Sequence, residues 1–452
     1  MKILQKINQY KADAGGFKNL FFHTALAITF TSGLSYMLGL IRDKSFAYTF
    51  GASSTLDVYN AAFVVPDLFL ATLVNGALSA AFIPIFANLE KHHKQKALEY
   101  INQVLSFGMS ILIAASVLFA IFLPYLVEFI VPGFSAAQQD QYITVTRLML
   151  ISPLLFTISN TFGNVLISTK DFLWYGLSPV FYNLGIIIGV FLFVPSFGIM
   201  GLVMGTVLGA FLHLMVRLPV VIRYGYRPKL TFKLEGELKK TATLMLPKML
   251  QLGMWQIMLW WFIRLASHLE EGSVTIYSFA RNFQSLPVSL IGVAIALAAF
   301  AKLSHVAAER DFTAFKAIVR EKTWVILGTT TLAAIALALI SHPLIQILLG
   351  GGKFDETAVL ATASLLAVYT LSIPFESLMH FLSRAHYALQ NTMRASMIHV
   401  GTIVLTLVLS QSLVERFGLY AIPMGFTTGL VLHILILEVS LRQLVGKLSA
   451  AK

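Results

Sequence analysis

The sequence predicts an all-α polytopic membrane protein with about twelve transmembrane helices in two six-helix halves. Hydrophobic residues make up 57% of the 452-residue chain and charged residues only 12%. A chain of this composition has too little polar surface to be solvated as a globule. The two further observations are a series of apolar segments of membrane-spanning length and a partial repeat of the first half of the chain in the second.

Apolar segments of the length needed to cross a bilayer follow one another along the chain. A span needs about 20 mostly apolar residues, and segments that meet this requirement begin near residues 21, 58, 97, 139, 172, 198, 237, 273, 311, 355, 392 and 418. The first follows a basic stretch, as the apolar run of a signal peptide does. It is too long for a signal peptide and lacks a small-x-small cleavage site, so we expect an uncleaved first span.

Lysine and arginine gather in the loops on one side of the predicted membrane: before the first span, after the second, between the sixth and seventh, and between the eighth and ninth. The alternate loops at 132–142 and 195–198 contain neither residue type, and the loop at 268–272 carries Glu270 and Glu271. Both termini are therefore predicted to be cytoplasmic. The net charge of +12 also favours contact with anionic lipid headgroups, and no basic stripe with interleaved aromatic residues indicates nucleic acid.

A repeat relates the two halves of the chain. Residues 197–213 share seven identities with residues 417–433 at a shift of 220, including Gly198 with Gly418. At a shift of 218, further identities relate Tyr59 to Tyr277, and several residues after Tyr59 to the corresponding residues after Tyr277. The sixth and twelfth spans therefore correspond, as do the second and eighth.

The repeat predicts the domain organisation. We expect an N-terminal six-helix half over residues 1–223, a cytoplasmic linker over 224–237 and a C-terminal six-helix half over 238–452. An even number of spans gives both halves the same orientation, which places their pseudo-twofold axis along the membrane normal. Transporters built this way rock one half against the other around a central cavity.

Few cations lie inside the predicted spans. An arginine near the bilayer centre costs roughly 2.5–3.5 kcal/mol on insertion scales, so it is retained where something polar must be met. The embedded cations are Arg42, Arg147, Lys248, Arg264 and Arg281. The four arginines are predicted to lie in the outer half of the membrane. Arginines at one depth favour an anionic ligand, and a diphosphate matches their bidentate donors.

Structural roles are the alternative for these cations. Arg147 and Arg264 could snorkel outward. Lys248, which follows Pro247, could contact a ligand or a backbone carbonyl opened by the proline.

The acidic residues of the first two spans also have two interpretations. Arg42 could pair with the adjacent Asp43 or with Asp57 instead of with a ligand. Asp57 could cap the helix that it begins, or it could orient Arg42 across the mouth of a cavity. Asp67 follows Pro66, and its carboxylate could bond backbone donors that the proline leaves open.

Glu376, His380 and Arg384 lie four residues apart, which puts them on one face of a single predicted helix. Such a series could relay protons or couple an ion gradient, or it could be an internally neutralised structural stripe. No metal site is expected, because a lone histidine is not one and the chain has no cysteine. The sequence also contains no phosphate-binding glycine loop, nucleophile triad or paired catalytic carboxylates, so no enzyme and no cofactor are expected.

The first two spans carry a long motif of regularly recurring glycines, prolines and charged residues. Its residues are Gly39-Leu40-Ile41-Arg42-Asp43, Phe50-Gly51-Ala52, Asp57, Phe63, Pro66, Gly76-Ala77, Ser79 and Phe82-Ile83-Pro84. With this motif the chain resembles the MurJ (MviN) family of lipid II flippases, in the multidrug/oligosaccharidyl-lipid/polysaccharide exporter superfamily. Tyr277 and Arg281 before Pro287 look like the second signature of the family, with Asn282 as the alternative to Arg281.

The resemblance implies translocation of the undecaprenyl-diphosphate-linked peptidoglycan precursor across a bacterial plasma membrane. The essential family positions would fall on Arg42, Asp57 and Arg281. A lipid-linked diphosphate substrate, membrane lipids and proteins of cell-wall synthesis would then be the partners. The alternative functions are export of another lipid-linked oligosaccharide or of a drug-like cation, and a scaffold without transport activity.

The chain also departs from the family pattern. A second family arginine in the first span is Tyr36 here, a basic pair in the second span is Leu70 and Ala71, and a nearby acidic position is Asn75. These changes make the expected cavity less cationic. Many family members have two further spans that form a groove for the lipid tail, whereas this chain ends at Lys452. We therefore expect either that the tail is handled between the halves or that the substrate differs.

Overall fold

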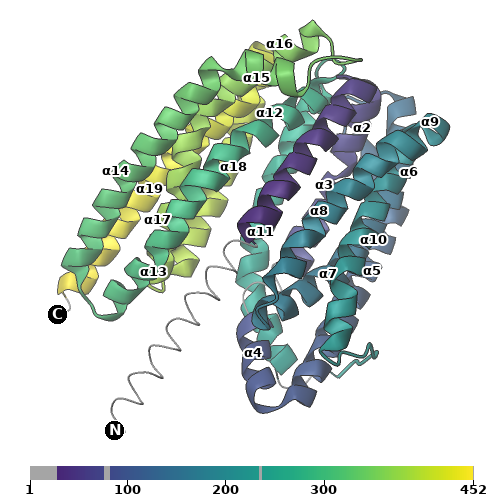
Figure 1. The fold of residues 1–452 in the computed structure, drawn as a ribbon. Helices are drawn as coiled ribbons and strands as arrows, with labels where there is room; N and C mark the ends of the chain where they lie inside the picture. The colour runs from purple at the N-terminus through teal and green to yellow at the C-terminus, as the bar shows by residue number, and fades with distance from the viewer. Residues whose placement is uncertain (1–27, 76–81, 234–236, 451–452) are drawn as a thin grey trace. The chain divides into compact units, whose positions relative to one another are not determined.

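The computed structural model describes residues 28–75, 82–233 and 237–450. Within these ranges the chain is helical and contains no β-strand, which confirms the predicted all-α class (Figure 1). The basic cluster before the first span, the motif residues Gly76, Ala77 and Ser79, and linker residues 234–236 lie outside them. Nine helical runs of the described chain are long and apolar enough to cross a membrane, so the chain is a multi-span membrane protein. One run, Thr392–Ala450, contains two of the predicted spans, and the number twelve stays a prediction.

The helices follow one another through short connections. In chain order they are a helix over residues 28–50, α2 (Ser54–Ala62), α3 (Val64–Phe69), α4 (Ile83–His92), α5 (Lys94–Ile130), α6 (Ala136–Met149), α7 (Ile151–Ser168), α8 (Phe172–Ile188), α9 (Val194–Phe197), α10 (Ile199–Arg223), α11 (Glu237–Ser267), α12 (Ser273–Pro287), α13 (Ala294–Ala308), α14 (Phe312–Leu339), α15 (Ser341–Leu348), α16 (Glu356–Tyr369), α17 (Ile373–Ala388), α18 (Thr392–Phe417) and α19 (Ala421–Ala450).

Local backbone geometry repeats along the chain at the shifts seen in the sequence. The π-helical segments η1 (Leu70–Asn75) and η4 (Val288–Val293) lie 218 residues apart. Gly198 has φ 55° and ψ −133°, and Gly418 has φ 53° and ψ −132°. Because such dihedral angles are accessible to glycine and strained for other residues, their recurrence supports a duplication. The division into two six-helix halves remains a prediction.

The contacts of the chain group its residues into two compact units. The first consists of Met1–Ser45, Val65–Ile121 and Val145–Met249, and the second of Phe46–Val64, Phe122–Thr144 and Leu250–Lys452. Segments from the predicted N-terminal half therefore contribute to the second unit.

In the first unit, helix α10 packs against α7 and α8 (Figure 1). The contact with α8 is made by glycines: Gly209 lies against Gly185, and Gly205 lies against Gly189, so that backbone touches backbone. Toward the other end of the unit, an aromatic core includes the rings of Phe82, Phe86 and Tyr100, with centroids 5.5 and 5.3 Å apart. Small residues thus let α8 and α10 approach closely.

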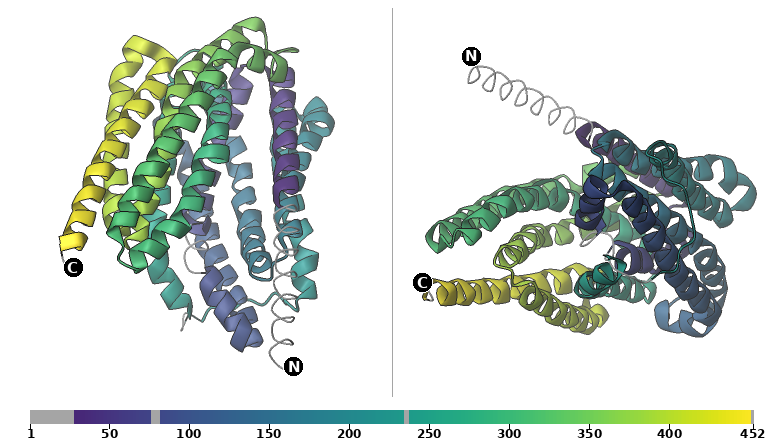
Figure 2. Two further views of the ribbon diagram at one scale, coloured as in Figure 1. Left: turned by 60° about the vertical axis from the view of Figure 1, so that its left-hand side comes forward. Right: turned by 90° about the horizontal axis from the view of Figure 1, so that it is seen from below.

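In the second unit, helices α13, α14 and α19 pack against α17, α12 packs against α16, and α19 also packs against α18 (Figure 2). The α18–α19 contact again uses glycines of the repeated segment. A Cβ atom on Gly425 would meet Ser410, and one on Gly429 would meet Thr406. The repeated glycines therefore have the same packing role in both units.

We predict that Gly205→Ala destabilises the protein. A Cβ atom at this position would meet the Cα of Gly189 at 2.6 Å, and such overpacking costs roughly 1–3 kcal/mol. The matched control is Gly401→Ala, where the added atom meets nothing within 4 Å and the helix gains about 0.5–1 kcal/mol from the lost chain freedom of glycine. Thermal unfolding of both purified variants in one detergent checks this prediction, and equal midpoints would contradict the close-packing account.

Candidate functional site

Asp57 of α2 holds the first turn of α12. Its Oδ2 accepts a hydrogen bond from the backbone N–H of Gly272 at 2.7 Å, and its Oδ1 accepts from the N–H and the hydroxyl of Thr275, also at 2.7 Å. The carboxylate is only 3% exposed. It therefore satisfies backbone donors that the start of α12 would otherwise leave unpaired, and its charge is favourable at the positive end of the helix.

The capping between α2 and α12 is reciprocal. Glu271, just before α12, accepts a hydrogen bond from the N–H of Ser54, the first residue of α2, at 2.8 Å. The N-cap residue of α2 is Ser53, so Asp57 caps a helix 215 residues away in sequence and not its own. Gly272 adopts φ +88°, and a Cβ atom there would meet the carbonyl of Ala52 at 2.7 Å. Only glycine fits this position without strain.

Arg281, two turns further along α12, forms a buried ion pair with Glu376 of α17. Its Nη2 lies 2.9 Å from Oε1 and its Nη1 lies 3.3 Å from Oε2 of the carboxylate, which is a bidentate pair. Gln284 accepts a hydrogen bond from Arg281 and donates one to Glu376 at 2.9 Å. The guanidinium also lies 5.3 Å from the ring centroid of Phe426. The site is thus an interlocked network that fixes the arginine in place.

Arg42, in the helix over residues 28–50, is held by neighbours of the first unit. Its Nε and Nη2 donate to Oδ1 of Asp43 at 3.0 and 2.8 Å, and its Nη1 donates to Oδ1 of Asn183 in α8 at 2.9 Å. Asn183 in turn donates to the carbonyls of Ser35 and Pro179 at 3.2 Å. The side chain of Arg42 remains 24% exposed, compared with 15% for Arg281.

Tyr182 and Asp67 complete the surroundings of Arg42 in the first unit. The phenol of Tyr182 interacts electrostatically with both side chains. Asp67 lies in α3, one residue after Pro66.

The other predicted cations contact backbone. Arg147 donates from Nε to the carbonyl of Ala120 at 3.0 Å, and Arg264 donates to the carbonyl of Phe129 while stacking on its ring at 4.9 Å. These are contacts within the protein, and they differ from the outward snorkelling considered for both residues. Lys248 lies in α11, and its side chain is outside the described part of the structure.

The three residues of the α17 series have different partners. Glu376 directs both oxygens to the network around Arg281, whereas Arg384 donates to the backbone carbonyl of His380 at 2.8 Å. Glu376 is thus linked most strongly to α12 and less to the two residues that follow it on its own helix.

The sequence analysis did not identify Arg217, which is more deeply buried than Arg42 or Arg281. It is 3% exposed and donates to the carbonyl of Ser159 at 2.7 Å, the hydroxyl of Ser178 at 2.8 Å and the carbonyl of Tyr175 at 3.3 Å. All these acceptors are neutral. Arg217 is absent from the embedded cations identified in the sequence. One sequence pattern could have identified Arg217 as buried. It continues the four-residue spacing of Gly201, Gly205, Gly209 and His213, which all lie on the buried face of α10.

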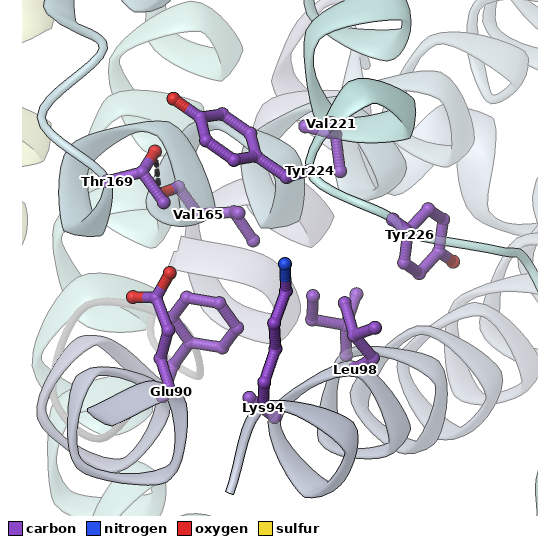
Figure 3. Close-up of a pocket in the computed structure, with 11 residues that line it drawn as sticks. Glu90, Lys94, Leu98, Val165, Thr169, Val221, Tyr224 and Tyr226 are labelled. Atoms are coloured by element: carbon purple, nitrogen blue, oxygen red, sulfur yellow. Dashed lines mark hydrogen bonds between the residues drawn. The ribbon is translucent and has the colours of Figure 1, made fainter. Parts of the chain in front are cut away.

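A small space opens near the ends of α4, α5, α7 and α10 in the first unit (Figure 3). The ammonium group of Lys94 points into it, with the carboxylate of Glu90 to one side. Burial raises the pKa of Tyr226, which lines it, to about 12. The volume of this space is about 20 Å³, which is enough for a water molecule and too small for a lipid headgroup.

The fold defines a class of multi-span helical transporter. The structure matches that of a lipid II flippase MurJ in an inward closed conformation with a TM-score of 0.81 and 22% identity, covering 94% of this chain and 90% of the other. It also matches an inward-facing multidrug resistance MATE family transporter of the MOP superfamily with a TM-score of 0.74 and 15% identity, covering 92% and 96% of the two chains. At these identities the likeness concerns the fold.

The chain belongs to the lipid II flippase MurJ family, whose model matches residues 46–451. Among its relatives, the probable lipid II flippase MurJ of Borreliella burgdorferi is 25% identical over 431 residues, covering 92% of this chain and 83% of the relative. The lipid II flippase MurJ of Burkholderia cenocepacia is 26% identical over 439 residues, covering 93% and 84%. The family recognised from the motif in the first two spans is thereby confirmed.

We predict that Asp57→Ala lowers the thermal midpoint of the protein. The substitution leaves the N–H groups of Gly272 and Thr275 without their acceptor, at a cost of about 1–3 kcal/mol for each buried donor. Asp57→Asn should be intermediate, because one amide oxygen replaces two carboxylate oxygens and the new NH₂ faces a donor. Unfolding midpoints equal to that of the parent for both variants would contradict the capping role.

A second prediction concerns the ion pair. Arg281→Ala leaves Glu376 buried and unpaired, which typically costs 3–5 kcal/mol, whereas replacing both partners by apolar residues of similar volume is often near neutral. The double variant Arg281→Met/Glu376→Leu should therefore unfold at a higher temperature than Arg281→Ala. If the double variant is the less stable of the two, the pair is not the stabilising unit that its geometry indicates.

Proposed function

We propose that this protein is a lipid II flippase, which moves the undecaprenyl-diphosphate-linked peptidoglycan precursor from the inner to the outer leaflet of a bacterial plasma membrane. The observation that carries the proposal is the family match over residues 46–451. Relatives that bear this name cover about nine tenths of the chain. With both termini in the cytoplasm, the basic loops lie on the side where the precursor is made.

We propose Arg42 as the principal contact for the diphosphate. It is partly exposed and held by one carboxylate and one amide, Asp43 and Asn183. A phosphate can replace them as acceptors, because two of its oxygens match the donor fork of a guanidinium. Arg264 and Lys248 would provide secondary positive charge. Within this proposal Asp57 is a positioning residue, because it fixes α12 and does not itself face an anion.

Arg281 has a different proposed role. Its guanidinium is already neutralised by Glu376, so it can bind a diphosphate only when that pair opens. Protonation of Glu376 would weaken the pair, and His380 and Arg384 follow it on the same helix. We therefore propose that these residues couple an ion to substrate binding at Arg281.

Alternating access would use the two six-helix halves, residues 1–223 and 238–452, joined by the linker 224–237. The repeated dihedral angles at Gly198 and Gly418 support this division. Rocking of two similarly oriented halves needs no change inside either bundle, which agrees with glycine-mediated packing that leaves little room for rearrangement.

Complementation of a bacterium depleted of its own lipid II flippase tests the proposal. We expect the parent and the control variant Arg416→Gln, an exposed arginine at the end of α18, to restore growth. Arg42→Gln should fail at an equal membrane level, because the principal contact proposed for the diphosphate is lost.

The flippase of Burkholderia cenocepacia serves as the positive control for the host. If it rescues growth and a well-expressed parent does not, the substrate is another lipid-linked oligosaccharide or a drug-like cation. Growth of the Arg42→Gln strain at the parental rate would exclude Arg42 as the diphosphate contact.

A further inference from the structure

A groove of about 620 Å³ runs between α14, α17 and α19 of the second unit. The beginning of α14 and the end of α19 lie side by side at the lower left of Figure 1, and the groove follows them. Its volume is typical of sites for small-molecule ligands, about 300–1,000 Å³. None of the residues discussed above as substrate contacts lines it.

Apolar and basic side chains both line the groove. The apolar lining includes Leu378 and Leu382 of α17 and Ile434 of α19. The basic side chains lie toward one end: Lys316 and Arg320, one and two turns into α14, and Arg442 near the end of α19. Such a lining matches a molecule that carries both a hydrocarbon chain and an anionic group.

The charges at the basic end do not cancel. Arg442 is paired with Glu438, whose Oε1 accepts from Nε at 2.8 Å. The side chains of Lys316 and Arg320 are exposed and form no ion pair or hydrogen bond with another residue of the described chain. The groove mouth therefore keeps two positive charges on one face of α14, and these are available to a phosphate.

Trp324 also lines the groove. It lies one turn beyond Arg320 on the same face of α14 and is 68% exposed. Tryptophan is enriched where hydrocarbon gives way to headgroups. Its presence beside the two cations is therefore typical of a site for a lipid headgroup.

We propose that this groove binds one anionic phospholipid of the cytoplasmic leaflet, with its phosphate on Lys316 and Arg320 and an acyl chain along α17 and α19. Basic pockets between transmembrane helices on the cytoplasmic side are suited to anionic headgroups. The proposal takes the cytoplasmic orientation of the start of α14 from the proposed function and is otherwise independent of it.

The occupant is a resident lipid and not the transported substrate. All the walls of the groove belong to one unit, whereas a substrate that changes leaflet has to follow the alternating contact between the halves. A lipid that keeps its headgroup on Lys316 and Arg320 stays in its leaflet. It would fill the groove beside α17, the helix that carries Glu376.

Trp324 provides a reporter for the test. The full chain is reconstituted into phosphatidylcholine vesicles with increasing fractions of phosphatidylglycerol brominated on its acyl chains, which quenches tryptophan on contact. The signal of Trp324 is the difference between the parent and Trp324→Phe. We expect this signal to be quenched at a lower mole fraction of brominated phosphatidylglycerol than of brominated phosphatidylcholine.

Two charge variants locate the headgroup. Lys316→Gln/Arg320→Gln should weaken the preference for phosphatidylglycerol by about 30-fold, because each basic residue near an anionic headgroup contributes roughly a fivefold change. The matched control is Lys91→Gln/Lys96→Gln, which removes the same charge from exposed positions of the first unit and should leave the preference unchanged. If the groove variant fails to fold, the parent is measured at increasing salt concentration instead. Its preference for phosphatidylglycerol must then weaken, because the contact is electrostatic.

Three outcomes would overturn the proposal: equal quenching by both lipids in the parent, an unchanged preference in the groove variant, or displacement of phosphatidylglycerol by equimolar undecaprenyl diphosphate. The last would make the groove a substrate site. Failure of the growth assay with intact quenching would reject the proposed function and leave the lipid site in place.

Discussion

The buried ion pair between Arg281 and Glu376 depends on the contact between the carboxylate of Asp57 and the first turn of α12. This contact fixes the start and the rotation of a helix that carries Arg281 two turns later. A guanidinium in a low-dielectric environment needs a partner at a defined place, and a small rotation of α12 would take it out of the reach of Glu376. The requirement for glycine at position 272 follows from the same contact, because the carboxylate and the carbonyl of Ala52 both approach the backbone there.

The first unit stabilises its buried charges in another way. Arg217 has only neutral acceptors, supplied by helices α7 and α8, and Arg42 shares one carboxylate with one amide. Neutral acceptors satisfy the donors of a guanidinium and leave its charge uncompensated. This holds for Arg217, whereas Arg42 and Arg281 are each paired with a carboxylate. The greater exposure of the Arg42 side chain, 24% against 15% for Arg281, favours Arg42 as the first group to meet an anionic substrate.

Sequence patterns predicted the fold class well, because hydropathy and loop charge are local properties that the membrane imposes on every span. They offered a pair of Arg42 with Asp43 as one alternative, because the two residues are neighbours in the chain. They did not predict that Glu376 pairs with Arg281, 95 residues away, since no periodicity links two separate spans. Arg217 was missed, and its acceptors lie on α7 and α8, which no pattern within its own helix predicts. The role of Asp57 could not be predicted either, because a helix cap from a distant segment depends on tertiary structure.

Lipid II movement in a purified system tests the central claim most directly. The protein is reconstituted into vesicles with lipid II, and the fraction of lipid II accessible to a membrane-impermeant lipid II-binding peptide is followed over time. The account predicts that this fraction rises faster with the protein than in empty vesicles, and that a lipid with the same undecaprenyl chain but no diphosphate is not moved. Equal rates with the protein and in empty vesicles, under conditions where the Burkholderia cenocepacia relative transports lipid II, would contradict it.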